Sequence, residues 1–185
     1  MLTRSLLVAL LLLAGCQSVR HPPLAQVANV DLARFMGDWY VIASIPTFIE
    51  QGAYNAVESY RLAADGTIET TFTFRAGGFD GEPKRYTPHG FVLDRASNAV
   101  WGMQFVWPVK ADYRIAYLAP DYGQTVIARE KRDYVWIMAR TPQISETDYQ
   151  RLVQFVAQQG YDTARIRKVP QRWEGNAATS PDPSR

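Results

Sequence analysis

The 185-residue chain contains only one cysteine and two histidines. A single cysteine cannot form an intramolecular disulfide, which excludes a small scaffold stabilised by disulfides. His21 and His89 have no serine, cysteine or paired carboxylate at the spacing of a catalytic motif, and the spacing of a metal site is also missing. We therefore expect no enzyme activity, no metal site and no cofactor.

The chain also lacks a marked excess of charge. It has 20 Lys and Arg against 18 Asp and Glu, which gives a net charge of +2. No basic run or basic stripe interleaved with aromatics is present, which argues against nucleic acid as a partner. The apolar run at residues 5–14 is too short to span the ~30 Å hydrocarbon core of a bilayer at about 1.5 Å per residue. This run is therefore not a transmembrane helix.

The N-terminal segment has the features of a bacterial secretion signal. Arg4 precedes the apolar run, which ends in Leu13-Ala14-Gly15-Cys16. This tetrapeptide resembles the lipobox of bacterial lipoproteins, in which cleavage precedes the cysteine and the thiol and the new amine are acylated. We expect residues 1–15 to be a signal peptide and Cys16 to be the lipid attachment site. The alternative is an incidental cysteine in an uncleaved leader.

Several acyl chains would anchor the chain stably, at about 0.8 kcal/mol per buried methylene. Gln17, in place of an aspartate, resembles lipoproteins that are sorted to the outer membrane. We therefore predict a protein anchored to the cell outer membrane and facing the periplasm. Residues 16–30 are expected to form the lipidated N-terminus and a tether, and residues 174–185 a disordered polar tail.

The body of the chain, residues 31–173, predicts one all-β domain with one helix. Apolar and polar residues alternate with a period of two, as at Ile68, Thr70, Phe72 and Phe74, and turn signals separate the runs. The expected strands cover 38–46, 55–63, 67–76, 85–94, 99–107, 112–119, 124–131 and 133–140, with a short strand near 165–169. Eight strands joined by short turns indicate an antiparallel up-and-down barrel. An amphipathic helix over 145–159 is expected to pack on its outer wall.

Three short motifs occur in order along this region: Gly37-Asp38-Trp39, Asp121-Tyr122 and the lone Arg140. In this order the motifs resemble those of the lipocalin family, over about residues 31–169. Within the family the segments around Trp39 and Arg140 resemble the bacterial outer-membrane lipocalins and their apolipoprotein D-like relatives. Ala119-Pro120 departs from the family pattern, in which a threonine more often precedes the Asp-Tyr pair. The resemblance implies that Arg140 stacks on Trp39 and closes one end of the barrel.

The resemblance also implies a small hydrophobic ligand inside the barrel. The residues expected to line the ligand site are Ala43, Tyr60, Phe72, Phe74, Met103, Phe105, Ile115, Tyr117, Ala128, Tyr134 and Trp136. Apolar loops at 45–53 and 107–109 are expected around the open end, with Glu58 pointing inward near that rim. A fatty acid or lysophospholipid, stored or transported at the cell envelope, is the predicted ligand.

Two other interpretations stay open at this point. One is a barrel filled by its own side chains, which acts through protein contacts of its apolar loops. The other is an enzyme on the same fold. The oligomeric state is also open, with a homodimer among the options.

Overall fold

The computed structural model describes residues 21–173. The strands are β1 (Gly37–Ile45), β2 (Ala53–Leu62), β3 (Ile68–Ala76), β4 (Glu82–Tyr86), β5 (His89–Val92), β6 (Val100–Val106), β7 (Val109–Leu118), β8 (Gln124–Ala128), β9 (Val135–Ala139) and β10 (Arg167–Lys168). The helices are α1 (Leu32–Phe35), α2 (Glu146–Gln158) and the 3-10 turn η1 (Thr163–Arg165). Cys16, the expected signal peptide and the expected tail at 174–185 lie outside the described residues.

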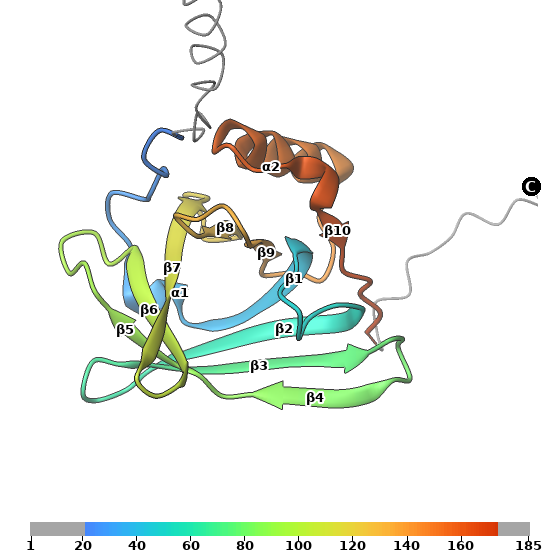
Figure 1. Ribbon diagram of the computed structural model, residues 1–185, viewed down its shortest axis with the longest axis horizontal. Helices are drawn as coiled ribbons and strands as arrows, with labels where there is room; N and C mark the ends of the chain where they lie inside the picture. Colours follow the sequence, from blue (N-terminus) through green and yellow to red (C-terminus); the bar gives the residue numbers. More distant parts are fainter. Residues whose placement is uncertain (1–20, 174–185) are drawn as a thin grey trace, which may run out of the picture.

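The strands form an antiparallel sheet that closes on itself through the pairing of β1 with β9 (Figure 1). β4 and β5 both pair with β3 and together occupy the place of one expected strand, interrupted at Thr87-Pro88. The predicted eight-stranded up-and-down barrel with a C-terminal helix is therefore confirmed. β10 adds to the edge of β1, as expected for the last short strand.

One end of the barrel is closed by α1 and by the contact between Trp39 and Arg140. The Arg140 guanidinium lies 3.8 Å from the centre of the Trp39 ring. Its Nη1 and Nη2 donate hydrogen bonds to the carbonyl oxygens of four residues, Asp38, Arg34, Phe35 and Met36, at 2.8–3.0 Å. Because these carbonyls include those at the end of α1, Arg140 caps the helix and joins it to the barrel. The predicted stacking of Arg140 on Trp39 is confirmed.

The second motif lies in the β7–β8 turn at the same closed end. The Asp121 carboxylate accepts a hydrogen bond from the Gly123 amide at 2.9 Å, so it caps the turn. The Tyr122 hydroxyl accepts one from the Asp31 amide at 3.0 Å, at the start of α1. The departure from the family pattern before Asp121 leaves this turn intact.

The helix α2 packs on the outside of β1, β8 and β9 (Figure 1). The Ser145 side chain caps its N-terminus by accepting a hydrogen bond from the Asp148 amide, as the sequence predicted. Leu152 and Val156 are fully buried against the barrel wall. Between His21 and Trp173, no helix is long and apolar enough to cross a bilayer.

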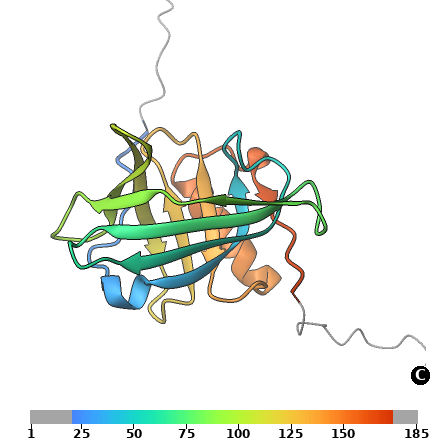
Figure 2. The same cartoon turned by 90° about the horizontal axis from the view of Figure 1, so that it is seen from below.

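Residues 21–30, assigned to the tether from the sequence, pack along the barrel instead. Leu24 and Val30 are buried, and the Val27 amide donates a hydrogen bond to the carbonyl of Ile115 at 3.0 Å. These apolar side chains, spaced three apart, supply the contacts that a solvated tether would not make. Figure 2 shows this segment running from the open end of the barrel, where the β1–β2 loop and the β6–β7 hairpin lie, toward α1 at the closed end.

Candidate functional site

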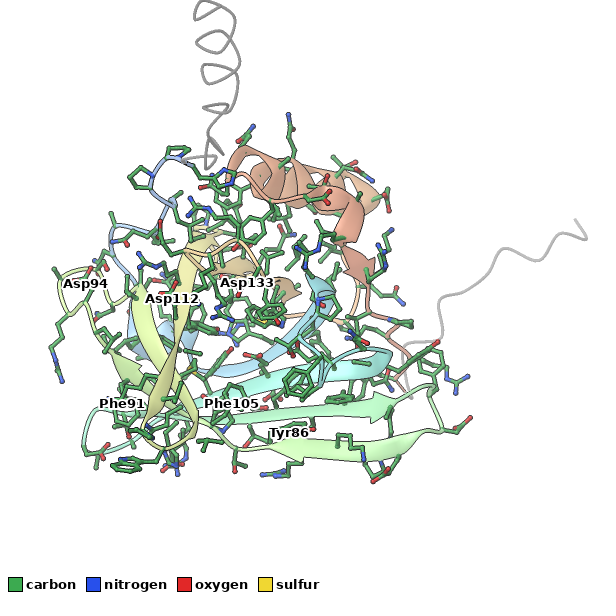
Figure 3. All side chains as sticks on the ribbon, in the orientation of Figure 1. Tyr86, Phe91, Asp94, Phe105, Asp112 and Asp133 are labelled. Carbon is green, nitrogen blue, oxygen red and sulfur yellow. The ribbon has the colours of Figure 1, made fainter. Side chains whose placement is uncertain are left out.

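A cavity of about 530 Å³ opens at the end of the barrel opposite Trp39. Its volume is within the range of pockets that hold small molecules, roughly 300–1,000 Å³. Met103, Tyr113 and Trp136 line its inner part. The outer part is lined by Phe48, Ile49, Tyr86, Pro88, Phe105, Val106 and Tyr134, together with Thr47, Glu50, Thr87, Ala111, Asp112 and Arg129. Figure 3 labels Phe105 on β6 and Tyr86 at the end of β4, on neighbouring parts of this wall.

Below the cavity the barrel is filled by aromatic side chains. The Tyr113 ring lines the cavity and stacks on Trp101, with ring centroids 5.2 Å apart. Trp101 in turn contacts Phe35 and Tyr60 edge to face, at 5.5 and 5.7 Å. The barrel is therefore hollow toward its open end and packed toward its closed end. A barrel that is filled by side chains along its whole length is therefore excluded, although its closed half is filled.

Three polar side chains lie buried together at the bottom of the hollow part. The Tyr60 hydroxyl hydrogen-bonds to the Glu58 carboxyl group and lies 2.6 Å from the Tyr113 hydroxyl. Burial, with the nearby charge of Glu50, raises the pKa of Glu58 to about 8. Burial, followed by the charge of Glu58, raises the pKa of Tyr113 well above its ordinary value. At neutral pH Glu58 is therefore mostly a neutral acid, which agrees with its apolar surroundings.

A second buried carboxyl group, that of Glu50, holds the β1–β2 loop at the wall of the cavity. It accepts hydrogen bonds from the Thr47 amide at 2.8 Å and from Nε1 of Trp136 at 3.0 Å. Burial raises the pKa of Glu50, and these hydrogen bonds oppose the rise. The indole of Trp136 is thus fixed in orientation where it faces the cavity.

The structure brings four of the eleven expected ligand residues to the cavity: Met103, Phe105, Tyr134 and Trp136. Four others, Tyr60, Phe72, Phe74 and Ile115, belong to the buried core inside the barrel and do not line the cavity. Phe105, at 54% exposure, lies at the rim rather than deep inside. Glu58 is buried beside Tyr60 and points inward as expected, although it is not among the residues that line the cavity or its rim.

The inward orientation expected for Ala43, Tyr117 and Ala128 is wrong. All three lie in the apolar layer between the barrel wall and α2, where the Tyr117 ring contacts Phe155 at 5.5 Å. The ladder between β1 and β9 shifts between Val41 and Ala43, and the ladder between β7 and β8 shifts between Ile115 and Tyr117. Each irregularity inserts one residue and turns the following side chains to the opposite face.

Several residues at the cavity had not been singled out from the sequence. Tyr113 and Ala111 follow from the alternation on β7 once Ile115 is placed inside. Glu50 and Arg129 lie in or beside loops, where strand alternation carries no information. Arg129 pairs with Asp133 at 3.5 Å and lies against the Tyr134 ring, so a cation stands at the edge of the cavity.

A larger hollow of about 990 Å³ lies along β3 and β4, next to Trp173. It is lined by the basic residues Arg75, Lys84, Arg85 and Arg172 as well as by Phe79 and Trp173. Because its wall carries four basic side chains, it does not suit the apolar body of a hydrophobic ligand. The cavity inside the barrel is therefore the candidate ligand site.

Comparison with known proteins agrees with this geometry. A family model described as the Lipocalin-like domain matches residues 30–171. The chain belongs to the lipocalin family. Lipocalins bind small hydrophobic ligands and are generally not enzymes. Both properties agree with the expectations from the sequence.

Relatives of this lipocalin occur in plants, bacteria and animals. Temperature-induced lipocalin-1 of Arabidopsis thaliana is 32% identical over 157 residues, which cover 78% of this chain and 81% of the plant protein. Outer membrane lipoprotein Blc of Escherichia coli K12 is 26% identical over 167 residues, which cover 88% and 92% of the two chains. Apolipoprotein D of Bos taurus is 31% identical over 132 residues, or 66% of each chain.

Solved structures support the fold of this lipocalin. Insecticyanin of the tobacco hornworm Manduca sexta superposes with a TM-score of 0.63 at 12% identity, covering 81% of this chain and 85% of insecticyanin. Lobster apocrustacyanin A1 superposes with a TM-score of 0.59 at 15% identity, covering 82% of this chain and 91% of apocrustacyanin. At these identities the likeness concerns the fold alone.

Proposed function

We propose that the protein is a membrane-anchored binding protein for a fatty acid or a lysophospholipid, and that it serves lipid storage or transport at the cell envelope. The observation that carries this proposal is the cavity at the open end, whose inner wall consists of Met103, Tyr113 and Trp136. An acyl chain that enters past Phe105 would reach these side chains and stop at the stacked rings of Tyr113 and Trp101. Burying its methylene groups there would supply the binding free energy.

The polar end of such a ligand would stay at the mouth of the barrel. Glu58 and Glu50 are the acids nearest the inner cavity, so an ionised carboxylate or phosphate would meet no cation there. Arg129 and Asp133 lie at the edge, where water can reach a head group. The ligand is therefore proposed to bind with its tail inward and its head outward.

The anchor is proposed to be the acylated Cys16, with the mature chain held at the outer membrane. Support comes from the lipobox-like Leu13-Ala14-Gly15-Cys16 and from the similarity to the bacterial outer membrane lipoproteins named Blc. The similarity to the plant lipocalin is of the same order, so relatives alone do not decide the location.

Tryptophan fluorescence tests the ligand proposal. Titration with a long-chain fatty acid or a lysophospholipid should change the emission of Trp136 and saturate at one ligand per chain. A Trp136→Phe variant should bind the same ligand, measured by calorimetry, but lose most of the signal.

Two arginine substitutions on β6 provide a matched comparison. Met103→Arg places a charge in the cavity and should weaken binding by at least about tenfold, because an unpaired charge in an apolar site is costly. Gln104→Arg, one residue along the strand on the partly exposed face, should leave binding unchanged. No saturable binding by the wild type, together with unfolding of Met103→Arg, would favour a barrel that acts through its surface.

A further inference from the structure

Large apolar side chains stand exposed around the open end of the barrel. Phe48 in the β1–β2 loop is 81% exposed and Trp107 in the β6–β7 hairpin is 82% exposed. Val106 and Val109, beside Trp107, are 72% and 68% exposed. We call these four residues and Phe105 the open rim. Exposed apolar groups gathered on one edge of a soluble domain indicate a surface that meets an apolar partner.

The described chain begins at this same end. Pro22 is held there, because its carbonyl oxygen accepts a hydrogen bond from Nη2 of Arg132 at 2.6 Å, in the loop between β8 and β9. Figure 1 shows the start of the described chain beside α2, across the barrel from the β6–β7 hairpin, and Figure 2 shows it at the end opposite α1. An anchor that precedes His21 is therefore attached at the open end of the barrel, on the side of the β8–β9 loop.

The length of the proposed tether decides which end of the barrel it can hold at a membrane. Five residue steps separate Cys16 from His21, and they span at most about 18 Å at roughly 3.6 Å per residue. The barrel is longer, since the ten residues of β2 extend over about 33 Å at roughly 3.3 Å per residue. A tether of this length cannot reach past the barrel and hold the closed end at the bilayer.

The charges beside the open rim fit an anionic surface. The acids of the β8–β9 loop and its neighbour on β7 are all paired with arginines: Asp112 with Arg114, Glu130 with Arg132, and Asp133 with Arg129. Within residues 21–173, Lys110 and Lys131 make no ion pair and are exposed. Lys110 lies 3.5 Å from the centre of the Phe91 ring, and neither lysine is neutralised by an acid of the described chain, so both exposed cations are available to lipid phosphates.

We propose that the open rim lies on the anionic membrane that carries the anchor, with Phe48 and Trp107 in the boundary between head groups and acyl chains. The mouth of the cavity then faces the bilayer, so a lipid passes between the leaflet and the cavity without crossing bulk water. This orientation rests on the proposed acylation of Cys16. It goes beyond ligand binding, because it assigns a function to Trp107 and Val109, which do not line the cavity.

Reporter tryptophans at the two ends of the barrel test this orientation. The full-length acylated protein, with Trp107→Phe and Trp136→Phe, is reconstituted into vesicles of phosphatidylethanolamine and phosphatidylglycerol with brominated acyl chains. Because Phe48 lines the outer cavity and Trp107 does not, the additional quenching when Trp107 is restored is the signal that distinguishes docking from a lipid in the cavity. Phe48→Trp then reports the open rim, and Leu93→Trp reports the opposite end, where Leu93 is 59% exposed.

The bromine atoms should quench the tryptophan at position 48 and leave the one at position 93 unquenched. Restoring Trp107 in the variant that carries Leu93→Trp should make that variant sensitive to quenching by the brominated lipid. Equal quenching at positions 48 and 93, or none at either, would refute the orientation. A dimer in sedimentation that Trp107→Glu dissociates, without quenching by lipid, would show that the rim binds a second copy instead. Mass spectrometry of Cys16 separates the proposed acylation from the proposed orientation. A Cys16 without acyl chains would refute the anchor. An acylated protein whose tryptophan at position 48 is not quenched would refute the orientation alone.

Discussion

The buried carboxyl group of Glu58 makes the stability of the barrel depend on pH in a direction opposite to that of most acids. We expect Glu58→Gln to stabilise the protein at pH 8 and to have little effect at pH 4.5. The amide has nearly the same shape and can still accept the hydrogen bond from the Tyr60 hydroxyl, but it has no proton to lose. The substitution therefore removes a titrating group and keeps the packing.

The magnitude follows from the raised pKa. Below pH 4.5 the group is protonated in both the folded and the unfolded chain and contributes no pH dependence. As the pH rises above 4.5, the unfolded chain releases the proton whereas the folded chain keeps it until about pH 8, so the free energy of unfolding falls over this window. The full loss corresponds to about 5 kcal/mol, at about 1.4 kcal/mol for each tenfold change in proton affinity.

Urea unfolding followed by tryptophan emission, at intervals from pH 4.5 to pH 8.5, measures this loss. The advantage of Glu58→Gln over the wild type should grow through the window and level off above pH 8. Glu50 also has a raised pKa, so some decline should persist in the variant. Glu82→Gln, at an exposed position, is the matched control and should follow the wild type. Parallel curves for Glu58→Gln and the wild type would refute the assignment of a neutral Glu58.

Two further predictions concern the closed end and the anchor. Trp39→Ala should cost about 3–5 kcal/mol in unfolding free energy, since the ring is fully buried, stacks on Arg140 and donates a hydrogen bond to the Phe35 carbonyl at 2.9 Å. Trp107→Ala should cost less than about 0.5 kcal/mol, and equal melting temperatures for the two variants would contradict the proposed importance of the closed end. Cys16→Ser should abolish incorporation of labelled fatty acid and move the protein out of the membrane fraction; a membrane-bound variant, with no label in the wild type, would disprove lipidation.

The fold could be predicted where one face of a strand meets water and the other meets the core. On β3, the alternation of Ile68, Thr70, Phe72 and Phe74 with polar residues matches their burial inside the barrel. The same alternation fails on β8, where four of five residues are buried because α2 covers the outer face. A strand that is buried on both sides loses its period of two, so the inner residue Ile127 cannot be told from its outer neighbours.

Irregularities in the strand pairing caused more errors in the predicted site residues than in the predicted fold. The shifts at Val41/Ala43 and Ile115/Tyr117 carry no glycine or proline that would mark them in the sequence. The four-residue helix α1 is too short to show a helical period, although Asp31 caps it by accepting a hydrogen bond from the Arg34 amide. Other cavity residues, such as Glu50, come from loops, whose positions depend on tertiary contacts such as that between Glu50 and Trp136.

Stability and binding are divided between the two ends of the barrel. At the closed end, Arg140 satisfies four carbonyl oxygens and the rings of Phe35, Trp39 and Trp101 are fully buried. Such packing tolerates no free volume, whereas the open end carries a cavity and exposed rings that a domain selected for stability alone would not retain. The packed end and the closure of β1 on β9, which leaves the barrel without an open edge, stabilise the fold and offset the cost of the hollow end. The residues that hold the fold are therefore the family motifs, and the residues that can change with the ligand are those of the cavity and the open rim.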